Sequence, residues 1–337
     1  MQVIRVARFG GPDVLVPAEV PGPLAGPGQA VIDVAAADVL FFDTLIRSGM
    51  ATAFIPIRPP YVPGNGVAGT VISVDPGTDV SWIGRRVVAH TGEQGGSGGY
   101  AQQAVVAVDD LIPVPDSLAL PEAAALLHDG ATALGLVESF PLRPREWVLI
   151  VGASGGLGAL LTQLVRAAGA RAIGTARGQA KLELTRTLGA EVVIDSSEPD
   201  WPRRVIEATE GRGADLVFDN VGGTIGRAAF TATAAGGRFS AHGAPAGGFA
   251  HIDPDEANRL GVTVRGIEQV QFTPVDLARL AGKALSATAK GLIRPVIGQT
   301  FPLERATDAH RAIEARTVTA KTLLEVRCHS TSSTSVS

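Results

Sequence analysis

The chain has 337 residues, which is too long for one ordinary hydrophobic core and predicts two domains. A net charge of −4 with 18% charged residues gives no electrostatic footprint for nucleic acid or for an anionic membrane, because phosphate groups are bound by clustered Lys and Arg. Its single cysteine, Cys328, permits neither an internal disulfide nor a thiolate zinc cluster, and this usage fits a reducing cytoplasm.

The N-terminal third of the chain predicts irregular β structure. Nine of the 22 prolines in the whole chain fall within the first 65 residues, between β-branched runs such as AVIDVAAA and GTVISV. The chain starts without an apolar segment and small-residue cleavage site, and it contains no apolar run of about eighteen residues. We therefore expect a protein that is neither exported nor inserted in a membrane.

From about residue 146 the pattern changes to alternating strands and helices. A strand at 147–151 precedes a helix whose apolar residues, from Leu157 to Ala168, form one stripe. Further apolar runs follow, among them RAIGTAR, AEVVID, ADLVFDNVGG, GRFSAHG and VTVRGI. Runs of this kind suit strands buried on both faces, so we expect a doubly wound parallel sheet.

The C-terminal part predicts two more helices. Thr273 and Pro274 have the features of an N-cap and a first helical residue, for a helix that continues to about residue 290. A second helix is expected over 303–316. The last ten residues, CHSTSSTSVS, are expected to be disordered.

The stretch VLIVGASGGLG at 148–158 allows two interpretations. Gly152 to Gly156 match G-x-S-x-G, the turn that presents a nucleophilic Ser154 in α/β-hydrolases, with Asp219 and His242 as possible triad partners. Ala153, Gly155 and Gly158 also fit G-x-G-x-x-G, a dinucleotide-binding turn, with Ala153 in place of its first glycine.

The surrounding sequence favours the dinucleotide interpretation. A second strand should end about 20 residues after such a turn with a group that meets the adenosine ribose, and RAIGTAR ends at Arg177. A hydrolase needs several βα units before the turn, which the proline-rich N-terminal region does not supply. Ser154 would then cradle phosphate or cap the helix.

Six segments resemble the quinone oxidoreductase (zeta-crystallin-like) branch of the zinc-independent medium-chain dehydrogenase/reductase superfamily. They are, in the order of the family, FGGPDVL, DTLIRSG, VPGNGVAGTV, GGYAQ, HDGATALGLV and GASGGLG. The resemblance implies an α/β protein in which a Rossmann domain is inserted into a GroES-like, β-rich catalytic domain, with the active site in the cleft between them. The expected boundaries are 1–122 and 270–327 for the GroES-like domain, 123–269 for the Rossmann domain and 328–337 for the tail.

The chain departs from the family pattern at positions that matter for the chemistry. Zinc alcohol dehydrogenases of the superfamily have metal ligands near Leu40, Asn65 and Gly66, and none of these side chains is a typical zinc ligand, so we expect no metal. Leu40 also replaces the usual asparagine beside the nicotinamide ribose. Ser196 stands where the family often has a tyrosine near the adenosine.

The resemblance implies NADPH as cofactor. Arg177 and Lys181 lie where the family contacts the adenosine 2′-phosphate, and no acidic residue ends that strand to bind the ribose of NAD. A solvated basic pair is the alternative. The full set of expected cofactor-binding residues is Phe42, Thr132, Ser154, Gly155, Gly156, Leu157, Arg177, Lys181, Ser196, Asn220, His242, Gly243, Ala244 and Arg316.

The candidate catalytic residues are His128 and Thr132. Thr132 resembles a family threonine that lines the nicotinamide pocket, although a helical threonine can also bond its own backbone. His128 could relay a proton at neutral pH, but a structural role is the alternative. The tyrosine that related enoyl reductases use as proton donor has no counterpart here.

These features predict an NADPH-dependent, zinc-independent reductase of a quinone or an α,β-unsaturated carbonyl or enoyl compound. A serine hydrolase using Ser154 and a non-catalytic NADPH-binding protein are the alternatives. The family also implies a homodimer, for which 262–270 would supply the edge strand. Small molecules are the expected partners.

Overall fold

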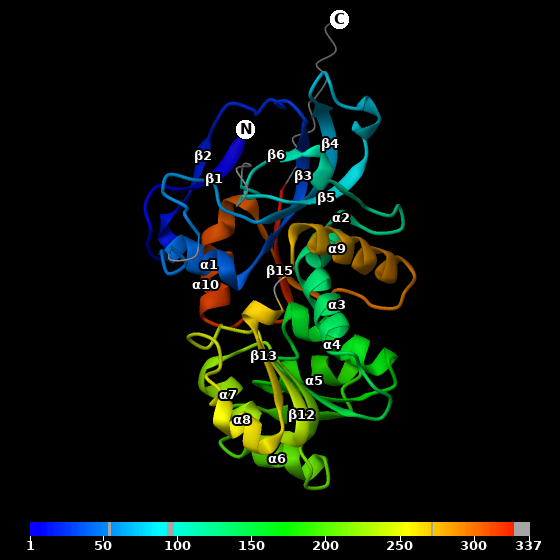
Figure 1. Cartoon of the computed structure of the whole chain (residues 1–337). Coiled ribbons are helices and arrows are strands. Elements are labelled where there is room, and N and C mark those ends of the chain that lie inside the picture. The colour runs from blue at the N-terminus through cyan, green and yellow to red at the C-terminus, as the bar shows by residue number, and fades with distance from the viewer. Residues whose placement is uncertain (53–54, 93–97, 271, 327–337) are drawn as a thin grey trace, which may run out of the picture. The chain divides into compact units, whose positions relative to one another are not determined.

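The computed structural model describes residues 1–52, 55–92, 98–270 and 272–326, and the chain divides into two compact units (Figure 1). The first unit comprises Met1–Leu127, Ile297–Val318 and the described residues from Thr322 onwards. The second comprises His128–Val296 and Thr319–Lys321. The predicted disordered tail, 328–337, lies outside the described residues.

The first unit is built around the long strand β3, which pairs antiparallel with β4, β6 and β15. Its main sheet has the order β14-β15-β3-β4-β5-β7, and β1 pairs antiparallel with β2. The strands are β1 Gln2–Val6, β2 Leu15–Glu19, β3 Gln29–Val39, β4 Gly66–Val74, β5 Arg86–His90, β6 Gln103–Ala107, β7 Ile112–Pro113, β14 Ile297–Pro302 and β15 Lys321–Glu325.

Helices cover this sheet and complete its core. Ile4, Ile32, Val67 and Leu324 are among the fully buried residues of the cluster. The helical segments are α1 Phe41–Ser48, α2 Leu120–Leu127, α10 Ala306–Glu314, and the 3-10 turns η1 Pro12–Val14, η2 Val80–Trp82, η3 Val108–Asp110 and η5 Leu303–Arg305. The helix expected over 303–316 is therefore a 3-10 turn followed by the shorter α10.

The second unit contains the predicted doubly wound parallel sheet. Its order is β10-β9-β8-β11-β12-β13, and every neighbouring pair is parallel. The strands are β8 Trp147–Val151, β9 Arg171–Ala176, β10 Val192–Asp195, β11 Ala214–Asp219, β12 Thr233–Ala241 and β13 Thr263–Gly266. β13 lies at the edge of the sheet, as expected for the segment 262–270.

Helices lie on both faces of this sheet (Figure 1). The helical segments of the second unit are α3 Asp129–Ser139, α4 Gly156–Ala167, α5 Gln179–Thr187, α6 Trp201–Ala208, α7 Gly223–Thr231, α8 Pro254–Leu260, α9 Pro274–Ala289 and the 3-10 turn η4 Ile267–Gln269. The predicted cap of α9 is confirmed, because the Thr273 hydroxyl accepts a hydrogen bond from the Asp276 N–H at 3.1 Å.

The unit borders follow the packing of two helices. The sequence boundaries assigned α2 in part to the Rossmann domain and α9 to the β-rich domain. In the structure, α2 packs on β3, β4 and β5, while α9 packs on α3. For this reason the borders fall after Leu127 and after Val296 rather than at 122 and 269.

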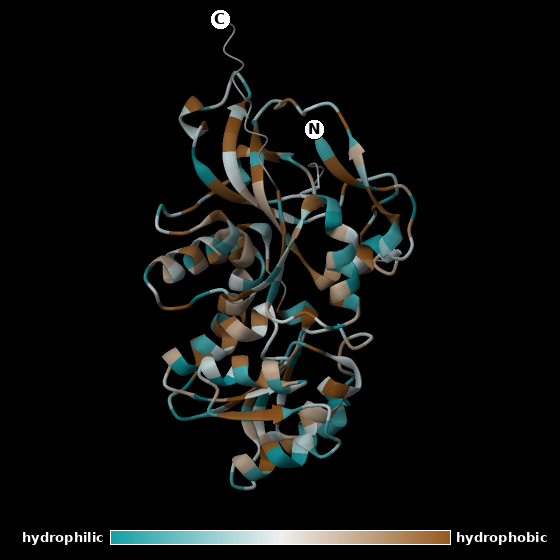
Figure 2. Cartoon of the chain, turned by 180° about the vertical axis from the view of Figure 1, so that it is seen from behind, coloured by the Kyte–Doolittle hydropathy of each residue, from teal (hydrophilic) through white to brown (hydrophobic). Residues whose placement is uncertain are grey.

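Burial of the central strands accounts for the continuous apolar runs in the sequence of the second unit. Every residue of β8 is buried, because helices cover both faces of the central strands. Figure 2 shows apolar strands beside helices that carry both hydrophobic and hydrophilic residues. Within the described part of the chain, no helix has the length and apolar character needed to cross a bilayer.

Candidate functional site

A glycine-rich turn links β8 to α4 in the second unit. Gly152 has φ +70°, a left-handed conformation that glycine adopts without strain. Gly158 allows the helix to approach the turn closely, since a Cβ placed there would lie 2.4 Å from the Gly152 carbonyl oxygen. These two glycines therefore fix the path of the backbone from strand to helix.

Gly155 leaves the beginning of α4 accessible. The N-cap residue is Gly155, which is exposed and has no side chain to cap the first N–H groups. A Cβ at this position would have its nearest neighbour at 3.5 Å. Ser154 is mostly buried, and its carbonyl accepts a hydrogen bond from Ala320. Helix N-termini with free N–H groups bind phosphate, so this turn fits a dinucleotide pyrophosphate.

Two cations follow the neighbouring strand β9. Arg177 is exposed, and Lys181 is half-buried in the first turn of α5. Burial lowers the pKa of Lys181, and the positive charge of Arg177 lowers it further. Two like charges at a helix N-terminus oppose both each other and the helix dipole, so an anion placed there would stabilise them.

An acidic residue that the sequence interpretation did not consider lies beside these cations. Asp195, at the end of β10, accepts a hydrogen bond from the Gly178 N–H at 3.2 Å. Hydrogen bonds from Ser197 lower the pKa of Asp195, and Gly178 and Arg177 add to this effect. Ser196 is half-buried, and its N–H donates to the Ala176 carbonyl at 2.9 Å.

A half-buried polar network ties three strands together at the carboxyl edge of the sheet. Asn220 donates to the Val151 carbonyl at 2.8 Å, and its Oδ1 lies 2.7 Å from His242 Nε2. The other ring nitrogen, Nδ1, lies 2.9 Å from the Ser240 hydroxyl. Asn220 Oδ1 can only accept, so Nε2 carries the proton and Nδ1 accepts from Ser240. Burial lowers the pKa of His242 to about 4, which keeps the ring neutral.

This network removes the base required by the hydrolase alternative. Both ring nitrogens of His242 are engaged by Ser240 and Asn220, and Asp219 accepts hydrogen bonds from the N–H groups of Val221 and Gly222. A serine nucleophile needs a histidine that is free to take its proton. The arrangement around Ser154 therefore favours the phosphate-binding role.

The loop after β12 lies at the same carboxyl edge of the sheet. Gly243 donates its N–H to the Asp219 carbonyl at 2.8 Å, and a Cβ on Gly243 would lie 2.0 Å from the Asn220 carbonyl carbon. The Ala244 carbonyl accepts the Gly248 N–H at 3.0 Å. Leu157, in the first turn of α4, is half-buried.

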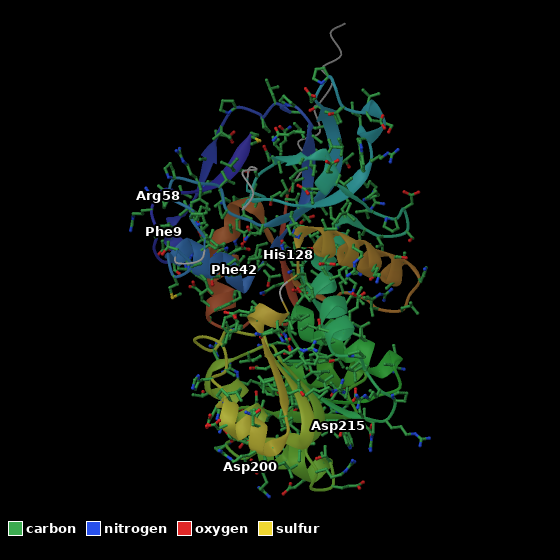
Figure 3. The ribbon with its side chains drawn as sticks, viewed as in Figure 1. Phe9, Phe42, Arg58, His128, Asp200 and Asp215 are labelled. Carbon is green, nitrogen blue, oxygen red and sulfur yellow. The ribbon has the colours of Figure 1, made fainter. Side chains whose placement is uncertain are left out.

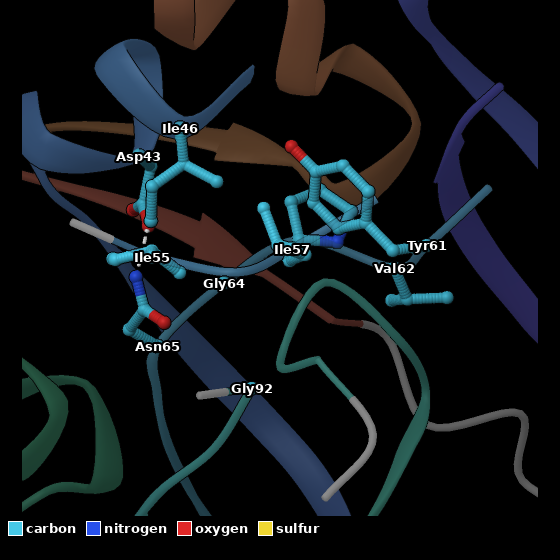
Figure 4. A pocket seen from close by; sticks show the side chains of 10 residues that line it. Asp43, Ile46, Ile55, Ile57, Tyr61, Val62, Gly64, Asn65 and Gly92 are labelled. Carbon is cyan, nitrogen blue, oxygen red and sulfur yellow. Dashed lines mark hydrogen bonds between the residues drawn. The ribbon is translucent and has the colours of Figure 1, made fainter. Parts of the chain in front are cut away.

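The first unit has a pocket of its own (Figure 4). It is a hollow that opens to solvent. The walls are mostly apolar. The pocket is lined by Asp43, Ile46, Ile55, Ile57, Tyr61, Val62, Pro63, Gly64, Asn65 and Gly92. Such a lining suits an apolar ligand that carries a few polar atoms.

Buried polar groups lie at one side of this pocket. Asn65 donates to Asp43 Oδ1 at 2.7 Å, as the dashed line in Figure 4 marks, and the Leu40 N–H donates to Oδ2 at 2.8 Å. Burial, together with the nearby negative charge of Asp43, raises the pKa of Tyr61 to about 12. The Tyr61 hydroxyl has no hydrogen-bond partner among the described residues, and its high pKa keeps it protonated.

Asp43 is also the start of a chain of hydrogen bonds through the core. The Tyr100 hydroxyl lies 3.2 Å from Asp43 Oδ2 and 3.1 Å from His310 Nε2. Tyr100 has a single hydroxyl proton for the carboxylate, so His310 Nε2 donates to the tyrosine oxygen. Burial lowers the pKa of His310 to about 3, with a contribution from Arg47. The sequence interpretation assigned no role to Asp43, although it lies in the segment DTLIRSG.

Four predicted site residues lie outside these clusters. Phe42 is a half-buried residue of α1, and His128 is the N-cap of α3 (Figure 3). Thr132 lies one turn further along α3, and its N–H donates to the His128 carbonyl at 2.9 Å. Arg316 is exposed and follows α10 in a left-handed conformation, with φ +55°. Their roles toward a cofactor remain predictions.

The former zinc-ligand positions have other roles in this chain. Leu40 is the N-cap of α1, and Asn65 bonds Asp43. Across residues 1–52, 55–92, 98–270 and 272–326, no three His, Cys, Asp or Glu side chains gather as a metal site would require.

Comparisons with known families place both units in one class of enzyme. Residues 26–116 match the alcohol dehydrogenase GroES-like domain, and residues 156–277 match the family described as zinc-binding dehydrogenase. Together with the parallel sheet and its glycine turn, these matches define a medium-chain dehydrogenase/reductase. The predicted fold, a Rossmann domain within a GroES-like domain, is confirmed.

Curated relatives narrow this class. The chain is 32% identical to a quinone oxidoreductase of Rattus norvegicus, over 93% of this chain and 94% of the relative. It is 30% identical to a 2-haloacrylate reductase of a Burkholderia species, over 92% and 95% of the two chains. The chain belongs to the quinone oxidoreductase branch of the medium-chain dehydrogenase/reductase superfamily.

Solved structures with the same fold include cofactor complexes. A mycobacterial protein complexed with NADPH is 32% identical, with a TM-score of 0.86 over 96% of this chain and 100% of that one. The quinone oxidoreductase of Escherichia coli complexed with NADPH is 26% identical, with a TM-score of 0.87 over the same shares.

Proposed function

We propose that this protein is an NADPH-dependent reductase of an activated double bond, in a quinone or in an α,β-unsaturated carbonyl or enoyl compound. The observation that carries the proposal is the pairing of an open glycine turn at α4 with Arg177 and Lys181 at α5. The first element fits a pyrophosphate, and the second fits a further phosphate on the adenosine ribose.

The residues of the second unit fit NADPH as follows. Ser154, Gly155 and Gly156 present backbone N–H groups and the start of α4 to the pyrophosphate, with Leu157 beside them. Arg177 and Lys181 hold the 2′-phosphate. Ser196 lies near the adenosine, and Asn220, His242, Gly243 and Ala244 shape the nicotinamide side of the sheet edge. Phe42, Thr132 and Arg316 are the further contacts that the family resemblance implies.

The Asn220–His242 pair contributes by rigidity rather than by direct hydrogen bonding. Its polar atoms are used within the protein, where they join the ends of β8, β11 and β12. A fixed sheet edge holds the loops that carry the cofactor, and such preorganisation lowers the cost of reaching a reactive geometry.

The pocket of the first unit suits the proposed substrates. Quinones and enones combine an apolar body with a carbonyl oxygen, and the pocket combines isoleucine walls with Asn65 and the protonated hydroxyl of Tyr61. A relative named 2-haloacrylate reductase supports reduction of a carbon–carbon double bond next to a carboxyl carbon.

Bound NADPH supplies the hydride, and the protein positions both partners and excludes water. The substrate carbon then needs a proton. Neither a metal-bound water nor the enoyl-reductase tyrosine is expected in this chain, so solvent delivers the proton, relayed by His128 or Thr132. Backbone and side-chain donors stabilise the negative charge that develops on the carbonyl oxygen.

A substrate screen tests the proposal directly. Purified protein is incubated with NADPH and a panel of quinones, enones, enals and enoyl thioesters, and the loss of NADPH absorbance is followed. Turnover of at least one class is expected. Tight NADPH binding without turnover of any compound would instead identify a non-catalytic NADPH-binding protein. Labelling of Ser154 by a fluorophosphonate probe would support a hydrolase.

The protein acts in the cytoplasm as a homodimer under this proposal. β13 lies at the edge of the parallel sheet, so a second copy can extend the sheet across a two-fold axis. Light scattering at micromolar concentration should give twice the chain mass, and a single 34.6 kDa particle would contradict the dimer.

A further inference from the structure

An ion pair between a buried lysine and a half-buried aspartate lies at the beginning of α4. Lys321 Nζ is 3.3 Å from Asp129 Oδ2, with the side chains 4% and 18% exposed. Lysine is rarely buried to this extent, because removing its charge from water is costly unless it is paired. Neither residue belongs to the cofactor set predicted from the sequence.

The pair packs directly against the phosphate-binding turn. A Cβ placed on Gly156 would lie 2.1 Å from Asp129 Oδ2 and 3.4 Å from Lys321 Cδ. The carboxylate therefore touches the first residue of α4. This is the helix end that attracts anions, so Asp129 lies close to where a dinucleotide pyrophosphate is expected.

The segment that carries Lys321 is held firmly against the same turn. The Ala320 N–H donates to the Ser154 carbonyl at 2.7 Å, and Ala320 forms a parallel bridge with Gly155. The Lys321 N–H donates to the Val296 carbonyl at 2.9 Å. Ala320 has φ +57°, a left-handed conformation that costs energy for alanine and persists only where the surroundings impose it. The backbone of Lys321 is thus fixed beside the turn.

We propose that Lys321 is a positioning residue that neutralises Asp129, so that the turn at α4 can accept the pyrophosphate of a dinucleotide. Without Lys321, the Asp129 carboxylate repels the pyrophosphate. The pair sets the affinity for the shared part of NADPH and NADH, and it does not choose between them. This inference rests on the proposed function.

Calorimetric titration of NADPH and NADH into matched variants tests the inference. Lys321→Met should weaken both dinucleotides by a similar factor of about ten, which corresponds to about 1.4 kcal/mol. Asp129→Asn should bind at least as tightly as the wild type. The double variant Asp129→Asn/Lys321→Met should recover affinity to within about threefold of the wild type, because the repelling charge is gone. Lys321→Arg should retain binding.

Salt provides a second readout, because charge repulsion is screened and lost packing is not. The defect of Lys321→Met should shrink as the salt concentration rises. A double variant as weak as Lys321→Met would overturn the inference, since the lysine would then act through packing alone. Unchanged affinity in Lys321→Met would overturn it as well, and so would a change in the NADPH to NADH ratio. A wild-type protein that binds neither dinucleotide would refute the proposed function itself.

Discussion

The two candidate binding regions of this protein are built in different ways. In the second unit, the carboxyl edge of the parallel sheet offers backbone N–H groups at Gly155 and two cations, while its polar side chains bond one another. In the first unit, the pocket offers isoleucine walls and a few polar atoms around Asp43. One region recognises a ligand through backbone geometry and charge, and the other through shape.

This difference explains why cofactor and substrate are not equally defined. Phosphate recognition depends on glycines at fixed positions and on cations, so it leaves a pattern in the sequence. An apolar pocket discriminates ligands weakly, by about 1–3 kcal/mol per methylene, and many side-chain combinations give the same shape. The substrate is therefore defined as a class of compound.

Replacement of Gly158 should have the largest effect, and it tests the geometry of the turn. The added Cβ of Gly158→Ala would meet the Gly152 carbonyl oxygen at 2.4 Å, so we expect a loss of about 3 kcal/mol in the free energy of unfolding. Gly155→Ala is the matched control, because its Cβ has no neighbour closer than 3.5 Å. Denaturant unfolding of both variants measures the difference. Equal stabilities would show that the close approach is not needed.

Acid should destabilise both regions through one histidine each, the half-buried His242 and the buried His310. Burial lowers the pKa of His242 to about 4 and of His310 to about 3, from 6.5. The unfolded chain therefore binds protons first, so stability is complete above pH 6.5 and is lost as the pH falls toward these values. At pH 5 each histidine should cost about 2 kcal/mol in the free energy of unfolding.

Single replacements separate the two histidine contributions. His242→Gln or His310→Gln should each remove about 2 kcal/mol of the acid-dependent loss, measured as unfolding free energy at pH 7 and pH 5. His251→Gln is the control, because His251 is exposed. An unchanged pH dependence in both His242→Gln and His310→Gln would mean that neither ring is held neutral.

The charged part of the cofactor region should show a smaller effect. Arg177→Ala/Lys181→Ala should weaken NADPH binding by at least about tenfold, or 1.4 kcal/mol, and leave NADH nearly unchanged. Arg186→Ala, on the exposed face of the same helix, is the control. Calorimetry measures the Kd of NADPH and of NADH for the wild type and both variants. Equal Kd values of the wild type for NADPH and NADH would contradict the assignment of the 2′-phosphate site.

The pocket should respond in substrate preference and not in cofactor affinity. Ile57→Ala enlarges the pocket, so kcat/KM for a bulky quinone relative to a small one should rise by about tenfold. The Kd of NADPH should remain the same. Val80→Ala, an exposed site in the same unit, is the control. A change in the NADPH Kd without a change in preference would assign the pocket to the cofactor.

Chelation should have the smallest effect of all. With Leu40, Asn65 and Gly66 at the former ligand positions, activity is expected to survive exhaustive treatment with a chelator, because no Lewis acid is removed. Loss of activity that added zinc restores would contradict this.

The sequence predicted the parallel sheet, the turn at 152–158 and the cation pair because each depends on neighbours along the chain. It missed Asp195 beside the cations, because the contact with Gly178 joins the end of β10 to the N-cap of α5, 17 residues away along the chain. The hydrogen bonds among Asn220, His242 and Ser240 link the ends of β11 and β12. The sequence predicted only that Asn220 and His242 lie near the cofactor, because both follow strands of the sheet.

Long-range packing accounts for the remaining differences. Asp129 and Lys321 are far apart in the sequence, and a lysine in the segment TAKTLLE looks like an ordinary surface residue until the bridge at Ala320 places it beside Gly155. The sequence shows the N-cap of α9, but it does not show that α9 packs on α3, because that contact depends on the tertiary fold. The helix after residue 303 is shorter than predicted, since its first turn is 3-10.

Isotope transfer to an enone substrate tests the central proposal, reduction of an activated double bond by NADPH, most directly. With NADPH deuterated at C4 in ordinary water, deuterium should appear at the β-carbon of the saturated product. With ordinary NADPH in heavy water, it should appear at the α-carbon, because solvent supplies the proton. An allylic alcohol with its double bond intact would show that the enzyme reduces carbonyl groups, and would contradict the account.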